Sequence, residues 1–335
     1  MTYTVGGIIQ AADYNGFVST TSGANVNNVW GTGSGDSGWG QTSLATVSSG
    51  GTVTAAQWAS LVNTLASMGS QTNTTITSRT APVAGNVIAI LANVNADLTS
   101  VTTNRGNAAA VGTEYGTFTG TTSKTTATGS GQTTWTITFT HTVTFASANA
   151  ARYFWNAGGR VRLQYGKSST GTDIDADWNT FAGLCGSIYV SGRVNSAAQT
   201  IAGTSYTGTT RVGGSGGTQT TLTTTTGWYQ LTPGAAATTI FQLNNASSPY
   251  TGEYIRTTAA VNAGAAVLTL VTTWFQPAVS AAGTTCNISG GTGVSSPATS
   301  IGAATAPTTL CTYIPPSTTY LTAAWGTPTI AASVA

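Results

Sequence analysis

Residues 131–166 read GQTTWTITFTHTVTFASANAARYFWNAGGRVRLQYG, and the first half of this stretch alternates strictly between two kinds of side chain. Threonine occupies every second position from Thr134 to Thr144. The positions between them hold Trp135, Ile137, Phe139, His141, Val143 and Phe145. Because successive side chains of a strand point to opposite faces, this pattern predicts a long strand with one buried and one solvated face.

A second alternation follows in residues 160–166, RVRLQYG, and predicts another half-buried strand. The positions expected to face the core are Val161, Leu163 and Tyr165, and the solvated positions are Arg160, Arg162 and Gln164. We expect the segment between the strands, SANAARYFWN, to be a short linker that leads to the turn at 157–159. Its aromatic cluster Tyr153, Phe154 and Trp155 is expected to enter the core.

The composition of the chain is unusual for its length of 335 residues. Only 5% of the residues are charged, against roughly 25% in ordinary globular proteins, while 40% are hydrophobic. Threonine, serine, asparagine and glutamine supply most of the polarity, and threonine is a β-branched residue that favours strands. The chain is therefore expected to be mainly β, with a surface that suits close packing of many copies without charge repulsion.

Several partner classes are disfavoured by the same composition. The net charge is +2 and there is no basic run, whereas a nucleic-acid groove needs clustered cations. No stretch approaches the roughly 18 apolar residues of a membrane span. The N-terminus, MTYTVGGIIQAADYNG, lacks the basic and apolar regions of a secretory signal. We expect neither a nucleic acid nor a membrane as partner.

The N-terminal third predicts helices. Residues 54–68 form an amphipathic pattern that opens on a capping box of Thr54 and Gln57. Residues 85–101 predict a second helix, and the opening residues show interrupted helical spacing. The faces away from the apolar stripes carry almost no charge, so we expect these helices to pack against other copies or another protein. A two-helix lid on the β body is the alternative.

A glycine-rich loop, GTGSGDSGWGQ, occupies residues 31–41. It lacks the Gly-Lys-Ser/Thr ending of a phosphate-binding P-loop, and no buried strand precedes it as in a dinucleotide-binding turn. We therefore predict a tight loop that is anchored by two aromatic side chains, Trp30 and Trp39.

The rest of the chain predicts an antiparallel β-sandwich of jelly-roll-like type. Further strands are expected at 187–194, 200–212, 228–231, 239–243, 252–261 and 266–275, with turn clusters between them. We divide the chain into a helical assembly module (1–106), the sandwich (107–277) and an extended arm rich in Gly, Ser, Thr and Pro (278–335).

Candidate chemical groups are few. The single histidine, His141, lies on the apolar face of the first strand and predicts a core residue rather than a catalytic one. Asp173, Asp175 and Asp177 form the only acidic cluster. Their spacing fails the EF-hand pattern, so they predict a solvated loop that leads into Trp178, with a looser cation site as the alternative. We predict no enzyme activity and no catalytic, cofactor or metal site.

The three cysteines match no zinc pattern. Cys185 lies in an apolar run and predicts a buried small hydrophobe. Cys286 and Cys311 share the C-terminal segment, and the sequence leaves open whether they pair.

Two stretches resemble virion structural proteins of tailed bacteriophages, especially those of large cyanophages and other aquatic phages. The pattern AADYN…VWGTGSGDSGWGQ…VTAAQWASLVNTL, within about residues 5–70, is similar to a short helical module of their structural and tail-associated proteins. TFASANAARYFWNAGGRVRLQYG, with DWNTFAGLCGSIY after it, resembles a β domain of the same proteins that covers about residues 130–277. The resemblance implies a particle component of the tail, fibre or baseplate, and it implies no catalytic residues.

Three hypotheses follow. The first is a structural subunit of a phage tail or fibre within the virion, a homo-oligomer with a trimer favoured, in contact with other virion proteins. The second is a capsid decoration or cement protein. The third is an adhesin that binds host surface glycan by stacking sugars on aromatic side chains, although core packing is the commoner use of such residues. The candidates for stacking are Trp228, Tyr229, Tyr250 and Tyr254.

Overall fold

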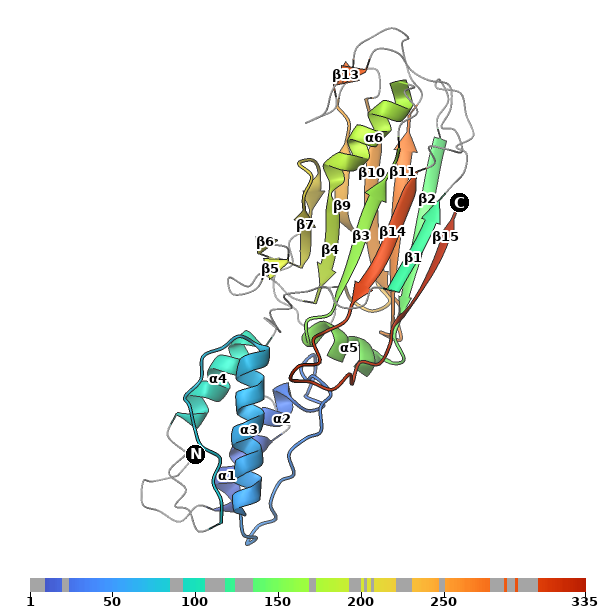
Figure 1. Cartoon of the computed structure of the whole chain (residues 1–335). Coiled ribbons are helices and arrows are strands. Elements are labelled where there is room, and N and C mark those ends of the chain that lie inside the picture. Colours follow the sequence, from blue (N-terminus) through green and yellow to red (C-terminus); the bar gives the residue numbers. More distant parts are fainter. Residues whose placement is uncertain are drawn as a thin grey trace.

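In the computed structural model, a small helical module lies at one end of a two-layered β body (Figure 1). The structure describes residues 10–19, 24–84, 93–105, 118–123, 135–168, 173–192, 200–201, 204–205, 208–220, 231–246, 251–277, 286–287, 293–294 and 307–335. The module contains α1 (Ala11–Val18), α2 (Val26–Val29), α3 (Ala55–Gln71) and α4 (Val94–Asn104). The β body carries two further helices, α5 (Ala148–Asn156) and α6 (Asp173–Cys185).

Helix α3 begins where the capping box predicts. The Gln57 backbone N–H donates to Thr54 Oγ1 at 3.3 Å, and the Thr54 N–H donates to Gln57 Oε1 at 2.8 Å. The apolar stripe of α3 is buried, and Tyr14 of α1 packs edge-on against Trp58 with ring centroids 5.4 Å apart. The predicted amphipathic helix is therefore confirmed, together with its start.

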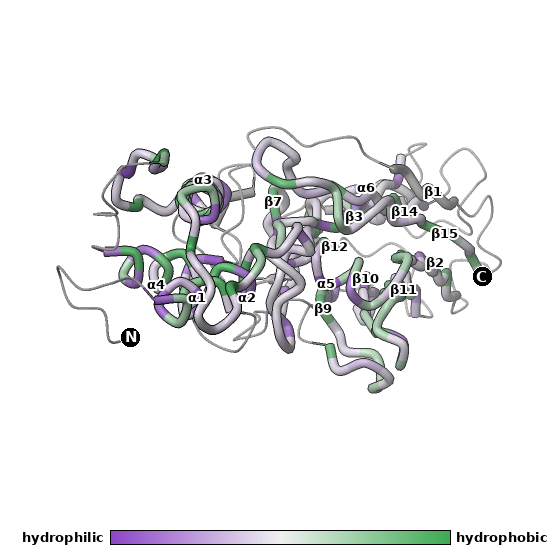
Figure 2. The backbone as a smooth tube through the Cα atoms, turned by 90° about the horizontal axis from the view of Figure 1, so that it is seen from below, coloured by the Kyte–Doolittle hydropathy of each residue, from purple (hydrophilic) through white to green (hydrophobic). Residues whose placement is uncertain are grey.

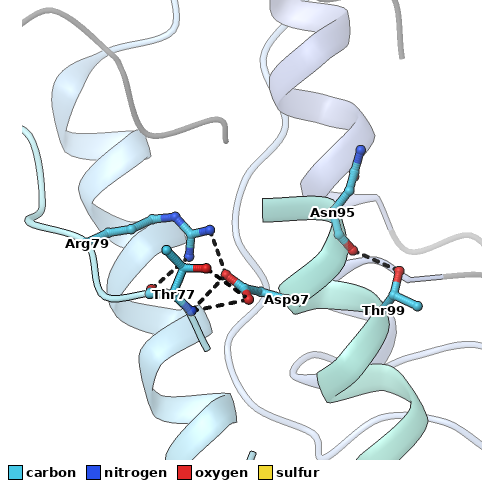
Figure 3. A network of polar contacts seen from close by, with 5 residues as sticks. All are labelled: Thr77, Arg79, Asn95, Asp97 and Thr99. Atoms are coloured by element: carbon cyan, nitrogen blue, oxygen red, sulfur yellow. Dashed lines mark hydrogen bonds and ion pairs between the residues drawn. The ribbon is translucent and has the colours of Figure 1, made fainter. Parts of the chain in front are cut away.

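Helix α4 is shorter at its N-terminal end than predicted. The sequence favoured one helix over 85–101, but Asn93 has a left-handed backbone conformation (φ 64°) and α4 begins after it. Val94, Leu98 and Val101 of the predicted stripe are buried, whereas residues 85–92 lie outside the described part. In Figure 3, Asp97 of α4 binds Arg79, with 2.6 Å between Nη2 and Oδ2, and accepts the Thr77 N–H at 3.2 Å.

Amide side chains hold the irregular segments of the module in place. Asn15 of α1 donates to the Val47 carbonyl at 2.7 Å and accepts the Val47 N–H at 2.8 Å. Asn27 of α2 makes the same two-way contact with Leu44, at 2.8 Å in both directions. Each amide replaces a backbone partner, so the asparagines that interrupt the helical spacing are structural residues.

The β body consists of two antiparallel sheets that face each other, which Figure 2 shows as separate layers. In spatial order, the first sheet contains β1 (Phe118–Ser123), β14 (Thr308–Ile314), β3 (Arg160–Gly166), β4 (Ser187–Ser191) and β7 (Thr209–Val212). The second contains β15 (Thr329–Val334), β2 (Trp135–Thr144), β11 (Val267–Gln276), β10 (Tyr254–Val261), β9 (Thr238–Asn244) and β8 (Thr218–Gln219). Two short ribbons pair β5 (Thr200–Ile201) with β6 (Thr204–Ser205), and β12 (Cys286–Asn287) with β13 (Gly293–Val294).

The mainly β fold with its helical module is confirmed. In β2, Ile137, Phe139, His141 and Val143 are buried while the threonines between them are exposed or half-buried. The expected strands at 187–194, 239–243, 252–261 and 266–275 correspond to β4, β9, β10 and β11. The segment 200–212 is divided among β5, β6 and β7. Of the strand expected at 228–231, only Leu231 is described, and it lies in a loop.

The segment between β2 and β3 is a helix, not the predicted linker. Helix α5 begins at a cap in which Ser147 Oγ accepts the Ala150 N–H at 3.1 Å. Its aromatic residues Tyr153, Phe154 and Trp155 are buried, as the sequence predicted. Burial of these three rings on a short helix outweighs the weak helical tendency of the sequence.

The C-terminal segment is part of the sandwich and corrects the predicted extended arm. β14 lies between β1 and β3 in the first sheet, and β15 pairs with β2 at the edge of the second. Cys311 and Tyr313 of β14 face the core. The body of the protein therefore does not end at Pro277, because two strands of its sheets come from residues 308–334.

The interior between the sheets contains polar groups that hydrogen-bond to one another. The hydroxyl of Tyr165 on β3 lies 2.8 Å from Thr257 Oγ1 on β10, which lies 2.8 Å from Thr272 Oγ1 on β11. Trp274 Nε1 of β11 donates to Thr309 Oγ1 of β14 at 3.3 Å. These contacts link the two layers and satisfy threonines that face inward.

Candidate functional site: the junction of the helical module and the sandwich

The glycine-rich loop 31–41 of the module packs against α5 of the sandwich, and we call this contact the junction. Trp39 is 1% exposed, and its indole Nε1–H donates to the main-chain carbonyl of Asn156 at 3.1 Å. Its ring lies edge-on to the half-buried Trp30, with centroids 6.3 Å apart. The predicted tight loop with two aromatic anchors is confirmed, and the surface that Trp39 anchors to is the end of α5.

Side chains of α5 donate back to carbonyl groups of the loop. Asn156 Nδ2 donates to the carbonyls of Gly38 at 3.0 Å and Asp36 at 2.6 Å. Arg152 donates to the carbonyls of Thr32, at 2.9 Å, and Gly35. The loop makes a few backbone hydrogen bonds of its own, such as that from the Gly40 N–H to the Gly31 carbonyl at 2.9 Å, and the donors of α5 satisfy further carbonyls.

Gly40 is needed for the close approach of the loop to α5. Its backbone has φ 73°, and a Cβ at this position would lie 2.3 Å from Cδ2 of the Tyr153 ring. A side chain here would therefore be strained by the backbone and would also displace a buried ring.

Two glutamines extend the junction on either side. Gln71, at the end of α3, donates to the Ala157 carbonyl at 3.2 Å. Gln41 donates to the Thr322 carbonyl at 3.0 Å and accepts the Thr322 N–H at 2.8 Å. Buried apolar residues run without interruption from the module into the sandwich, so the two parts share one core.

A second cluster lies at the other end of the sandwich and corrects the predicted acidic loop. Residues 173–177 belong to α6 rather than to a solvated loop, and Asp177 is fully buried. Its carboxyl group lies close to that of Glu253, which is also fully buried and precedes β10. Asn245 Nδ2 donates to Glu253 Oε2 at 3.0 Å. The side chains of Asp173 and Asp175 lie outside the described residues.

Burial raises the pKa of both carboxyl groups of this pair, because the charged forms lose their hydration. The pKa of Asp177 rises to about 7, and the negative charge of Asp177 raises the pKa of Glu253 further. One helical stripe in the sequence, formed by Trp178, Phe181, Ala182 and Cys185, is a signal from which α6 could have been predicted. Nothing in the sequence pointed to Glu253 as the partner.

Where they are described, the remaining candidate residues are buried or packed against other side chains. His141 is fully buried in β2, as predicted. Cys185 and Cys311 are buried free thiols, and the side chain of Cys286 lies outside the described residues. Tyr254 stacks on Phe275 with ring centroids 4.9 Å apart, and Arg256 covers its ring at 5.0 Å. The other three aromatic candidates for glycan stacking, at 228, 229 and 250, lie outside the described residues.

No protein-family model, curated protein or solved structure matches this chain. The resemblance to phage structural proteins therefore stays a prediction from the sequence. In the described part of the chain, no helix combines the length and apolar character needed to cross a membrane. Nor do three or more metal-ligating side chains of the described residues gather in one place.

Proposed function

We propose that the chain is a non-enzymatic structural subunit of a tailed-phage particle, in its tail, fibre or baseplate, where it assembles as a homo-oligomer with a trimer favoured. The proposal starts from the sequence resemblance, whose two stretches meet at the junction. The glycine-rich loop of the first stretch packs on α5 of the second, so the two stretches form one structural unit.

The observation that carries the proposal is the outward surface of the helical module. Exposed residues of α3 are Ala56, Ser60, Asn63, Ala66 and Ser70, and those of α4 are Asn95, Ala96, Thr99, Ser100 and Thr103. All are small or uncharged, whereas the exposed side of a solvated helix normally carries charged residues. Small uncharged side chains let another chain approach closely without repulsion or the cost of desolvating ions.

The shape of this surface is compatible with a docked segment. A groove of about 400 Å³ runs between α3 and the segment 73–79, and Ala66, Gly69 and Ser70 line its α3 side. The junction then transmits force between a docked module and the sandwich, because hydrogen bonds and a shared core join the two parts.

Particle composition is the first test. Virions of the phage that encodes the chain are purified and analysed by mass spectrometry, and particles are labelled with gold-conjugated antibody. We expect the chain in stoichiometric amounts and gold on the tail. Gold on the capsid shell would support a decoration protein instead, and absence from the virion would contradict both assignments.

Oligomeric state is the second test. Light scattering on the full-length protein should give the mass of a trimer, and the double variant Ser60→Glu/Ala66→Glu should shift it toward the monomer. Thr136→Glu, an exposed position of β2, is the matched control and should leave the mass unchanged. A monomeric native protein at all concentrations would contradict self-assembly through this surface.

A further inference from the structure

The Asp177–Glu253 pair joins the two sheets at the end of the sandwich away from the helical module. Asp177 lies on α6, which connects β3 and β4 of the first sheet, and Glu253 precedes β10 of the second (Figure 1). The neighbouring Trp178 donates from Nε1 to Gln276 Oε1 at 2.8 Å, and its ring lies 5.4 Å from that of Trp274. The contact between α6 and the second sheet therefore includes this pair of acids.

The pair has few donors to support negative charge. Among the described residues, neither oxygen of Asp177 nor Oε1 of Glu253 accepts a hydrogen bond from an N–H or hydroxyl group. The amide of Asn245 reaches Glu253 Oε2, and Gln276 also faces Glu253. Two buried carboxylates in contact repel each other strongly, whereas one proton between them forms a charge-assisted hydrogen bond.

Charged side chains on the surrounding elements are directed to other partners. Lys167, after β3, donates to the Ser168 carbonyl at 2.9 Å, and Arg211 of β7 donates to the Gly217 carbonyl at 3.2 Å. Arg256 of β10 points to the opposite face of its strand from Glu253 and covers the Tyr254 ring. The segments 169–172, 247–250 and 278–285, which border α6, β9, β10 and β11 in the chain, contain no acidic or basic residue. The other acids of α6 are Asp173 and Asp175.

We propose that Asp177 and Glu253 form a proton-dependent latch that holds α6 against the β9–β10 hairpin, and that loss of the shared proton to solvent releases α6. The closed latch keeps one proton at a pH where exposed carboxyl groups have lost theirs. Release exposes both groups to water, where each carboxylate is hydrated and no longer repels the other at contact distance.

The pH range follows from the two states. In the open state the carboxyl groups have ordinary pKa values of about 4, while in the closed state the pKa of Asp177 is about 7. Below about pH 4 both states hold the proton, and the latch has its full strength. As the pH rises from about 4 to 7, only the closed state keeps the proton, so opening increases by roughly tenfold per pH unit. Above that range opening levels off.

Cys185 reports this opening because it is a fully buried free thiol on α6 itself. The full-length protein is labelled with 4,4′-dithiodipyridine at pH 5, 6, 7 and 8, and labelling at each cysteine is followed by peptide mass spectrometry. Rates are divided by those of a cysteine-containing reference peptide at the same pH. We expect Cys185 to react roughly fiftyfold faster at pH 7 than at pH 5. Cys311, buried in β14, should show a much smaller change.

Variants identify the groups responsible. Glu253→Gln supplies an amide that donates permanently to Asp177, so it should abolish most of the pH dependence at Cys185. Asp177→Asn does the same from the other side and serves if the first variant does not fold. Asp36→Asn, an exposed acid in the loop 31–41, is the matched control and should keep the wild-type profile.

Three outcomes would overturn the proposal. One is equal corrected labelling of Cys185 at pH 5 and pH 7, and another is a pH profile that persists in both amide variants. The third is protection of Cys185 by millimolar CaCl₂ at pH 8 in the wild type but not in Glu253→Gln. That result would assign the pair to a divalent cation instead of a proton.

Discussion

The indole Nε1–H of Trp39 donates to the carbonyl of Asn156 at 3.1 Å, across 117 residues of sequence. The contact is reciprocal at the level of the segments, since Asn156 Nδ2 donates to the carbonyl of Gly38, the residue before Trp39. Each segment thus satisfies backbone groups that the other leaves open. The loop and α5 form one unit, and neither is expected to keep its conformation alone.

Replacing Trp39 by phenylalanine removes the indole donor while keeping an aromatic ring in place. The Asn156 carbonyl would lose its partner in a buried site, and a small void would form. We expect the free energy of unfolding to fall by about 1–3 kcal/mol in urea denaturation.

The control for this variant is Trp30→Phe. Trp30 donates to the Thr42 carbonyl at 3.2 Å in a solvent-exposed contact, so its loss should cost less than about 1 kcal/mol. Equal effects of the two substitutions would show that the hydrogen bond to Asn156 contributes no more to the free energy of unfolding than the exposed bond of Trp30.

Gly40→Ala tests the close approach at the junction. Both the left-handed backbone and the Tyr153 ring oppose a Cβ, so we expect a loss of about 2–4 kcal/mol by urea denaturation. Gly35→Ala in the same loop is the matched control, because Gly35 is also left-handed (φ 56°) but has open space at the Cβ position. Its cost should be only the backbone term of about 1 kcal/mol. A Gly40→Ala variant no less stable than Gly35→Ala would contradict the packing of this loop on Tyr153.

Asp97→Asn tests the ion pair with Arg79 shown in Figure 3. The two side chains are 10% and 6% exposed, and Asp97 also accepts the Thr77 N–H. Loss of the negative charge leaves the Arg79 guanidinium poorly compensated, so we expect about 2–4 kcal/mol of destabilisation by urea denaturation.

Thr99→Ala is the control on the same helix. The exposed Thr99 hydroxyl donates only to the Asn95 carbonyl, one turn earlier in α4, and its removal should change stability by less than about 0.5 kcal/mol. An Asp97→Asn effect as small as that of Thr99→Ala would mean that segment 77–79 is not held by α4.

The parts of the fold that the sequence predicts best are those with local signals. The strict alternation of residue types in β2 predicts a strand with one buried face. The capping box at Thr54 and Gln57 marks the start of α3. The left-handed Asn93 carries no comparable signal, because asparagine is also common within helices and loops. The sequence therefore does not predict that α4 begins at Val94.

The parts that the sequence misses depend on distant partners. In β14 the inward-facing side chains of Thr309 and Cys311 are small. The strand therefore lacks a clear apolar alternation, and the sequence predicts an extended arm there. Its partners in β1 and β3 come from residues 118–123 and 160–166. Asp177 is the clearest case at a candidate site. Its acidic neighbours in the sequence indicate a solvated loop. Its burial depends instead on Glu253, which follows 76 residues later in the sequence.

Truncation after Pro277 is the sharpest test of the corrected C-terminus. An extended arm can be removed without loss of the sandwich, but here removal takes β14 from between β1 and β3 and splits the first sheet. It also leaves Trp274 Nε1 and Gln41 without their partners at Thr309 and Thr322. We therefore expect the 1–277 protein to be insoluble or to lack a cooperative thermal transition by circular dichroism. Removal of 329–335 alone takes only the edge strand β15, and this control should remain folded with a lower melting temperature. A 1–277 protein that melts cooperatively near the wild-type temperature would instead support the predicted extended arm.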